Sequence, residues 1–380
     1  MSSRSKNWRA VVAGAAAAGL ACSALVTAAM PAQAAKKKGG ELKVMTQNLY
    51  LGADLFPAIE ASKQGTTPFL LAAAKVYQNA MASDFPTRAA AFAKTVKEQQ
   101  PDIIGLQEVT EWITARQDPN GPALQSQDFL QIVQQAFQAE GLSYKVVGVS
   151  KNASIGPFPY IDPDTSCGAP TSVLPTGWPC RIQMKDRDVI MVNTKTTGLS
   201  YKKKSVKSGQ YKSQQTYVIA GQTISFARGY VYADMTYNGA KFRMANTHLE
   251  VGAESAPIQQ KQAKQFVKVI SKGAGNVVAT GDFNTDAYGK YSAKSYKILT
   301  KSYFTDTWNK KKDGQGLTCC QNAELSNPAS ENVTRIDLVL THGKVKAKGS
   351  INTNITPFRE SPAPLWESDH ASTVARVKVS

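Results

Sequence analysis

Short apolar runs that end at a polar residue recur along this chain, and they constrain its fold more than any other feature. The clearest examples are Glu108 after Ile103–Gln107 and Asp282 after Val277–Gly281. Short apolar runs of this kind are typical of buried β-strands. A rigid sheet can hold the side chains at its strand ends within a small volume. The pattern therefore predicts a sheet-based fold that gathers carboxylates, amides and imidazoles in one place.

The remaining elements predict a mixed sheet structure with helices outside. Strands are expected at Leu42–Leu49, Ile103–Gln107, Asp188–Val192, Ile224–Thr236, Lys241–Asn246, Asn276–Thr280, Arg335–Leu340 and Ser372–Val379. Helices are expected at Phe85–Gln100, Asp128–Glu140 and Pro257–Lys272, the last with Ser255 as its cap. Helices alternate with strands, but the turn Asn238-Gly239 is typical of a hairpin.

Two segments are predicted to be loops. Lys151–Arg181 is rich in Pro, Gly and Ser, which favours a long surface loop. Leu199–Lys212 carries five lysines, four of them between Tyr201 and Tyr211, which favours a basic hairpin or loop.

The N-terminus has the order of regions that is typical of a secretory signal peptide. Arg4, Lys6 and Arg9 precede an apolar stretch from about Val11 to Met30, and Ala32-Gln33-Ala34 fits a cleavage site. We expect a Sec-type signal peptide at residues 1–34, a linker at 35–40, and one catalytic domain at 41–380 of a secreted, extracellular protein. A transmembrane anchor is the alternative interpretation.

Four cysteines follow the predicted signal peptide. An even number of cysteines in an oxidising compartment indicates disulfides. Cys167 and Cys180 would close a short loop, whereas the adjacent Cys319 and Cys320 would bond to each other or reach elsewhere. A zinc site is a weaker alternative, because the cysteines have no Cys-x-x-Cys spacing.

The chain is strongly basic, which favours polyanionic partners. Residues 1–34 carry three basic and no acidic residues, so subtracting three from the net charge of +17 leaves +14. Nucleic acid, anionic lipid headgroups and cell-wall polymers all fit this charge. General solubility is an equally good explanation, so charge does not choose the substrate.

The order of the polar strand ends resembles the endonuclease/exonuclease/phosphatase superfamily, which includes pancreatic-type DNase, abasic-site endonucleases and bacterial sphingomyelinases. The matching pieces are Thr46-Gln47-Asn48-Leu49, Gly105-Leu106-Gln107-Glu108-Val109, Asn246-Thr247-His248-Leu249, Gly281-Asp282-Phe283-Asn284, Arg335-Ile336-Asp337 and Ser368-Asp369-His370. The resemblance spans about Leu42–Val379. It implies an α/β fold, a four-layer α/β/β/α sandwich of two packed mixed sheets with outer helices.

The resemblance also implies metal and phosphate ligands. Glu108 would be the main metal ligand, with Asn48 beside it binding metal or phosphate, and Asp369 would be a further ligand. Asp282 and Asn284 would orient the attacking water and the phosphate. Mg²⁺, or else Mn²⁺ or Ca²⁺, suits such oxygen ligands.

The same resemblance implies roles for two histidines. His370 would abstract a proton from water or stabilise the transition state, with Asp337 orienting its ring. His248 would bind phosphate or protonate the leaving oxygen. Its supporting carboxylate would be Asp186, with Asp188 as a close rival.

Two further residues complete these predictions. Arg228 would contact phosphate from the strand before the Asn-Thr-His motif. His342 is expected in a solvated turn and is not assigned to the site.

Together these features predict a secreted, metal-dependent phosphodiester hydrolase. Nucleic acid is the favoured substrate because charge mildly supports it, and we expect a monomer. A phospholipase C-like, sphingomyelinase-like or glycerophosphodiester hydrolase is the second hypothesis. A non-catalytic polyanion-binding protein is the third, but it would be expected to have lost metal or acid–base residues.

Overall fold

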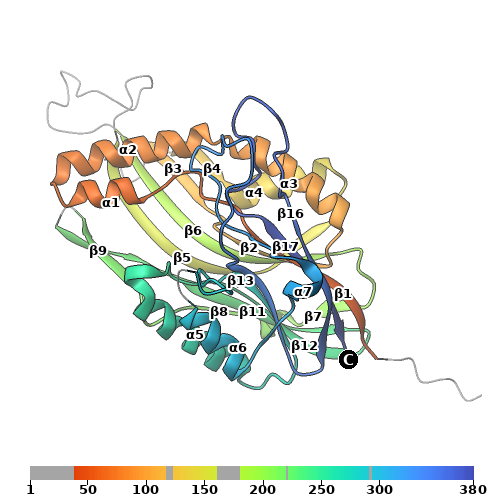
Figure 1. Cartoon of the computed structure of the whole chain (residues 1–380). Coiled ribbons are helices and arrows are strands. Elements are labelled where there is room, and N and C mark those ends of the chain that lie inside the picture. The colour runs from red at the N-terminus through yellow and green to blue at the C-terminus, as the bar shows by residue number, and fades with distance from the viewer. Residues whose placement is uncertain (1–37, 117–122, 161–179, 220, 291–292) are drawn as a thin grey trace, which may run out of the picture. The chain divides into compact units, whose positions relative to one another are not determined.

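Two β-sheets pack face to face, and helices cover their outer faces (Figure 1). The computed structural model describes residues 38–116, 123–160, 180–219, 221–290 and 293–380. All of these residues belong to one folded unit, Lys38–Ser380.

The first sheet has eight strands in the order β16-β17-β1-β2-β6-β3-β4, with β5 paired to β6. The strands are β1 (Gly40–Asn48), β2 (Ile103–Gln107), β3 (Glu111–Arg116), β4 (Ala123–Asp128), β5 (Tyr144–Tyr160), β6 (Cys180–Asn193), β16 (Val345–Thr353) and β17 (Ser372–Val379). Strands β1 and β2 are parallel, whereas β1 and β17 are antiparallel. The sheet is therefore mixed.

The second sheet has seven strands in the order β14-β15-β13-β12-β11-β7, with β8 paired to β11. The strands are β7 (Leu199–Tyr201), β8 (Lys207–Gln210), β11 (Gly229–Tyr237), β12 (Ala240–His248), β13 (Val277–Asp282), β14 (Thr305–Asp306) and β15 (Asp337–His342). Strands β12 and β13 are parallel. A separate hairpin consists of β9 (Gln215–Ile219) and β10 (Gln222–Phe226).

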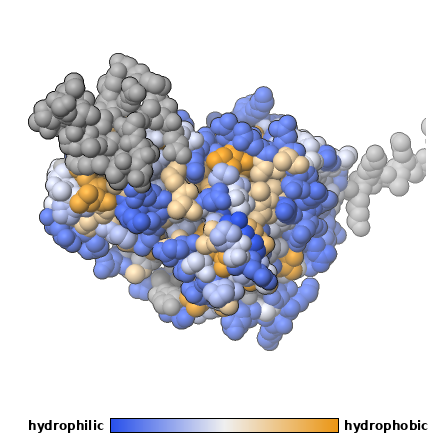
Figure 2. Space-filling model, turned by 90° about the horizontal axis from the view of Figure 1, so that it is seen from above, coloured by the Kyte–Doolittle hydropathy of each residue, from blue (hydrophilic) through white to orange (hydrophobic). Residues whose placement is uncertain are grey.

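The helices form the two outer layers. They are α1 (Phe56–Ser62), α2 (Thr66–Ala82), α3 (Phe85–Gln99), α4 (Phe129–Ala139), α5 (Ala256–Ser271), α6 (Lys294–Ser302) and the short α7 (Lys310–Asp313), with 3₁₀ turns η1 (Lys203–Ser205) and η2 (Ala253–Ser255). Helices α1 to α4 lie along the first sheet, and α5 and α6 lie along the second (Figure 1). The face seen from above is mostly hydrophilic with separate hydrophobic patches (Figure 2).

Three apolar cores separate the four layers. The first lies between the helices α2 to α4 and the first sheet, where Phe92 packs with Met45 and Ile104. The second lies between the sheets, and the third joins Phe266 of α5 to the second sheet. Side chains of a strand alternate between two faces, so β1 sends Val44 to the second core and Met45 to the first. The predicted sandwich of two packed mixed sheets with outer helices is confirmed.

Strand register brings the polar strand ends together. Asn48 is paired with Gln107, so Glu108 follows at the same edge of the first sheet. In the second sheet, Asp282 is paired with His248 on one side and with Asp337 on the other.

A buried polar bridge joins the two sheets directly behind these strand ends. The amide of Asn246 donates to the carbonyl oxygens of Leu106 and Val189 at 2.8 and 3.1 Å, and its Oδ1 accepts from Gln107 at 2.6 Å. A Cβ atom on Gly105 would lie 2.1 Å from Oγ1 of Thr280, so the sheets approach too closely there for any side chain.

Several predicted boundaries were wrong. The predicted loop Lys151–Arg181 is strand in its first ten residues, because β5 pairs with β6 as far as Tyr160. The predicted strand Ile224–Thr236 is divided between β10 and β11, with Arg228 in the break rather than on a strand. The basic segment Leu199–Lys212 contributes β7 and β8, which pair with β11.

Smaller differences concern single residues. Ser255 occupies the N-cap of α5 but makes no side-chain cap bond, because its hydroxyl donates to Gln215. His342 ends β15 and stacks on Tyr303, with its Nδ1 atom 2.7 Å from the Tyr303 carbonyl oxygen, instead of lying in a solvated turn. Cys167 lies outside the described residues.

None of the helices in the described segments is both long and apolar enough to cross a membrane.

Candidate active site

The strand ends of both sheets surround one pocket of about 360 Å³. Predicted site residues that line it are Glu108, Arg228, His248, Asp282, Asn284, Asp369 and His370. Asn48, Asp186 and Asp337 lie behind this lining and contact it or lie close to it. The structure therefore brings together every residue that the sequence assigned to the site.

Asn48 connects the two sheets at the pocket floor. Its Nδ2 atom donates to Oε1 of Glu108 and to Oδ2 of Asp282, both at 3.1 Å, and its Oδ1 accepts from the Tyr50 amide. Glu108 follows β2 with a φ of 51°. Its Oε2 accepts from the Leu51 amide at 2.7 Å. Glu108 is therefore held in a rarely populated backbone conformation by contacts to the segment after β1.

Two carboxylates of the pocket, Glu108 and Asp369, have pKa values above their usual range. Burial, and then the negative charge of Asp369, raises the pKa of Glu108 to about 7. Burial also raises the pKa of Asp369, although His370 and Arg88 oppose that rise. Buried carboxylates that repel one another are stabilised by a bound cation. Their hard oxygen donors suit a divalent cation such as Mg²⁺, Mn²⁺ or Ca²⁺. Glu108 and Asp369 both line the pocket, and Asn48 contacts Glu108.

Asp282 lies between the two histidines. Its Oδ2 atom is 3.3 Å from Nε2 of His248 and 3.9 Å from Nε2 of His370. Its Oδ1 accepts from the Asn284 amide at 2.9 Å. Burial, and then Asp337, raises the pKa of Asp282 to about 6. Asp282 is therefore mostly ionised at neutral pH.

His370 is held by a carboxylate. Its Nδ1 atom lies 2.8 Å from Oδ2 of Asp337, whose side chain is fully buried. Burial alone would lower the pKa of His370, but the charges of Asp337 and Asp369 raise it well above its usual value. The ring is a cation near neutral pH, with Nε2 directed toward Asp282.

His248 has the opposite environment. Its Nδ1 atom lies 2.9 Å from a guanidinium nitrogen of Arg228, and its Nε2 lies 3.0 Å from the side-chain nitrogen Nδ2 of Asn284. Burial, and then the charges of Arg228 and His370, lowers its pKa well below the usual value. The ring is neutral, and Nδ1 accepts from Arg228.

Asp186 and Asp188 both lie near His248. The ligand atoms of the three residues are within 4.8 Å of one another. Asp186 accepts from Asn152 at 3.1 Å, whereas Asp188 is fully buried and its pKa is raised well above normal by burial and then by Asp186. Because Arg228 occupies Nδ1 of His248, neither carboxylate takes the orienting position that the resemblance implied.

Arg88 of α3 supports the pocket from beneath, and sequence analysis missed it. This fully buried side chain donates to the carbonyl oxygens of Leu49, Tyr50 and Glu367 at 2.7, 3.2 and 3.1 Å. Burial lowers its pKa to about 10, so it remains charged at neutral pH. Arg88 thus joins the segment after Asn48 to the segment before Asp369. A lone arginine in a helical stretch gave no signal of this role.

Cys319 and Cys320 form part of the pocket wall, with Sγ of Cys320 4.0 Å from Nε2 of His370. Arg335, which flanks Asp337 in the sequence, pairs with Asp306 instead. Asp337 is therefore free to bind His370.

Comparison with known proteins agrees with this arrangement. A model of the Endonuclease/Exonuclease/phosphatase family matches residues 45–370. Among curated protein sequences, none matches significantly.

Solved structures share the fold at low sequence identity. A family protein from Bacteroides thetaiotaomicron is 15% identical, with a TM-score of 0.53 over 90% of this chain and 100% of that one. A mannosyl-6-phosphatase from the same organism is 16% identical, with a TM-score of 0.51 over 88% and 99%. A humanized D. rerio TDP2 is 14% identical, with a TM-score of 0.52 over 89% and 98%.

The family model covers most of the chain, and the structure gathers the matched strand ends into one pocket. The chain therefore belongs to the endonuclease/exonuclease/phosphatase family of phosphoester hydrolases.

Proposed function

We propose that this protein is an exported hydrolase that cleaves phosphodiesters with a divalent metal ion, Mg²⁺ in the first instance. The observation that carries the proposal is the position of Asp282 between two histidines with opposite partners, Arg228 at His248 and Asp337 at His370, with Asn48 joining it to Glu108. That combination offers a base, a hydrogen-bonding group and a positive charge to one phosphate. The signal-peptide pattern at residues 1–34 supports export.

Each side chain has a part in this proposal. Asp282, ionised at neutral pH, accepts a proton from water, whose oxygen forms a bond to phosphorus while the bond to the leaving oxygen breaks. His370, kept cationic by Asp337, stabilises the developing negative charge. His248 and Asn284 bind the phosphate oxygens. A metal ion held by Glu108, Asn48 and Asp369 would neutralise phosphate charge and stabilise the departing oxygen.

The nucleic-acid hypothesis rests on the overall basic charge. Among the described residues, the pocket lining includes Arg228 but no lysine. The lysine-rich segment meets β11 at two places. Tyr201 is paired with Met235, far from Arg228, whereas Gln210 is paired with Gly229 and the Tyr211 amide donates to the Arg228 carbonyl oxygen at 3.0 Å. The fold does not distinguish between substrate classes, since similar structures include both a mannosyl-6-phosphatase and a TDP2.

A phosphodiester with an apolar group is the second candidate. Part of the pocket lining is apolar, in contrast to the polar residues described above. It consists of Leu55, Phe56 and Phe226. Such a surface favours a lipid-like leaving group over a nucleic-acid strand.

Metal removal tests the proposed reaction. The purified protein is given bis(4-nitrophenyl) phosphate with Mg²⁺, and release of nitrophenol is followed by absorbance. We expect hydrolysis that stops in EDTA and returns with added Mg²⁺. Full activity in EDTA would contradict the metal requirement.

The two substrate candidates are separated by parallel incubations with plasmid DNA and with phospholipid vesicles. Cleavage of lipid while the plasmid stays intact would exclude the nuclease hypothesis, and the reverse result would exclude the lipid hypothesis.

A further inference from the structure

An apolar cavity adjoins the catalytic pocket and shares a wall with it. Its lining combines helices α1 and α2, strands β3, β5 and β6, and the hairpin β9–β10. The side chains that line both spaces are Leu55, Ile59 and Phe226. The cavity therefore lies directly beside the pocket in which we place the phosphate.

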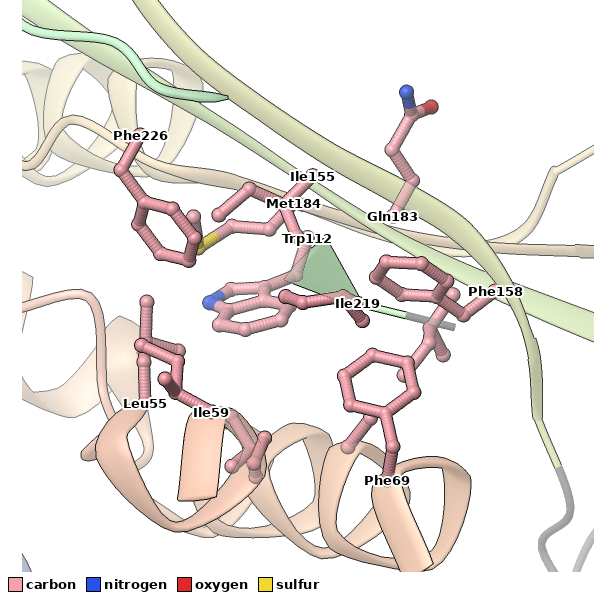
Figure 3. A pocket seen from close by; sticks show the side chains of 14 residues that line it. Leu55, Ile59, Phe69, Trp112, Ile155, Phe158, Gln183, Met184, Ile219 and Phe226 are labelled. Atoms are coloured by element: carbon pink, nitrogen blue, oxygen red, sulfur yellow. The ribbon is translucent and has the colours of Figure 1, made fainter. Parts of the chain in front are cut away.

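The interior of this cavity is built almost wholly from hydrocarbon (Figure 3). Trp112 lies in the middle of the side chains that line it (Figure 3), and the rings of Phe69 and Phe158 meet edge to face with their centroids 4.8 Å apart. Gln183 contributes the polar side chain of the lining, but its amide points away from the cavity (Figure 3) and bonds Ser154 on the neighbouring strand. An apolar interior of this kind binds hydrocarbon and offers nothing to a charged or sugar-like group.

The cavity is tied to the metal-binding side of the pocket through one residue. The indole nitrogen of Trp112 donates to the Leu51 carbonyl oxygen at 2.8 Å, and the Leu51 amide donates to Oε2 of Glu108 at 2.7 Å. Leu51 thus links the two sites, because it contacts Trp112 in the cavity and Glu108 in the catalytic pocket. A single substrate molecule could therefore place one part against Trp112 and another beside Glu108.

Exposed apolar side chains occur at the catalytic pocket and beside a residue of the cavity lining. Phe56 and Val251 line the catalytic pocket and are 53% and 38% exposed. Val218, beside the cavity-lining Ile219, is 67% exposed. Exposed apolar side chains at the mouth of a site are typical of surfaces that meet apolar ligands.

We propose that this cavity is a subsite for a hydrocarbon chain esterified to the phosphate that the catalytic pocket binds. The substrate class is an amphiphilic phosphodiester, with its charged phosphate at Asp282 and the start of an alkyl or acyl chain against Trp112. This inference rests on the proposed function for the position of the phosphate.

The volume of the cavity limits how much a bound hydrocarbon chain can strengthen substrate binding. Its free interior volume is about 50 Å³. At about 15 Å³ for each water-sized group, this holds about three methylene groups. Each buried methylene strengthens binding about fourfold, so three give about 60-fold.

Alkyl esters of 4-nitrophenyl phosphate test the subsite. The wild-type protein is assayed with methyl, propyl and hexyl 4-nitrophenyl phosphate in Mg²⁺, below the concentrations at which they form micelles. We expect kcat/KM to rise about 15-fold from the methyl to the propyl ester, which adds two methylene groups, and about 60-fold to the hexyl ester, of which about three added methylene groups fit the cavity. Equal values for the three esters would overturn the subsite.

Filling the cavity tests the residues. Ala73→Leu adds bulk to the lining from α2, and we expect it to abolish the gain with chain length while hydrolysis of the methyl ester is kept. Ala72→Leu is the matched control, because this substitution adds the same bulk on the same helix at a position outside the lining of this cavity. If Ala73→Leu does not fold, Ile219→Ala enlarges the cavity and should move the gain to longer chains. A gain that is unchanged in these cavity variants would overturn the assignment.

A binding measurement separates this inference from the proposed function. Hexyl phosphate and methyl phosphate are titrated into the wild-type protein by calorimetry, with no turnover involved. Tighter binding of hexyl phosphate together with no hydrolysis of any ester would contradict the proposed function but support the subsite. Equal binding would overturn the subsite, whether or not the esters are hydrolysed, and DNA cleavage with equal binding would favour a nucleic-acid substrate.

Discussion

The two active-site histidines lie on either side of one carboxylate but have opposite neighbours. His370 binds Asp337 through Nδ1, whereas Nδ1 of His248 faces the guanidinium group of Arg228. Both rings are buried, and burial alone would make both of them neutral. The difference shows that carboxylates such as Asp337 oppose the effect of burial on a histidine, whereas a guanidinium group adds to it, so similar histidines at two strand ends can have different roles.

Removal of the shared carboxylate should have the largest effect. Asp282→Asn keeps the shape of the side chain but removes the base and the negative charge between the rings. We expect kcat to fall by about 10³–10⁴-fold, within the range that general acid–base groups supply. Activity assays with bis(4-nitrophenyl) phosphate measure this. Asp234→Asn is the control, because Asp234 pairs with Arg243 at a half-exposed position. Near-normal activity in Asp282→Asn would remove Asp282 from the mechanism.

Replacement of the partner of His370 should have a smaller effect. In Asp337→Asn the ring loses the charge that most strongly opposes burial, so its pKa should fall and the ring should become neutral near pH 7. We expect activity to fall about 10–100-fold, as for other residues that orient a histidine. NMR titration of the ring gives the pKa. Asp306→Asn breaks the neighbouring buried pair with Arg335 and should lower stability while leaving the His370 titration unchanged.

Replacement of the partner of His248 should have the smallest effect on rate. In Arg228→Met one of the charges that lower the pKa of His248 is lost, so that pKa should rise. We expect the acidic limb of the pH–rate profile to move to higher pH, and kcat/KM to fall about tenfold with the lost hydrogen bond to a charged group. The surface variant Arg376→Met provides the comparison. An unmoved acidic limb would show that Arg228 does not keep His248 neutral.

Much of the catalytic site could be predicted from the sequence because strand ends are local features. Apolar runs such as Val277–Gly281 mark a strand, and Asp282 follows it directly. Partner choice could not be predicted in the same way. Arg228 lies 20 residues from His248 along the chain and meets it only because β11 and β12 form a hairpin.

The errors in the fold have a similar origin. Gly156 and Pro157 are typical of a loop, yet pairing with β6 keeps this segment in strand β5. Helices α1 and α2 were not predicted, although α2 packs on the first sheet through Phe69, Val76 and Tyr77. These same helices form part of the cavity lining, so local sequence patterns indicated which residues gather at the pocket but not the cavity beside it.

The polar bridge at Asn246 has a consequence for how such a protein can change. Sliding one sheet along the other would separate Glu108 from Asp282, but the bridge and the bare backbone at Gly105 allow only one alignment. Alignment of the reacting groups is thus set inside the molecule, away from the loops around the pocket mouth. Insertions, deletions or substitutions in those loops can therefore change the substrate while the reacting groups stay aligned.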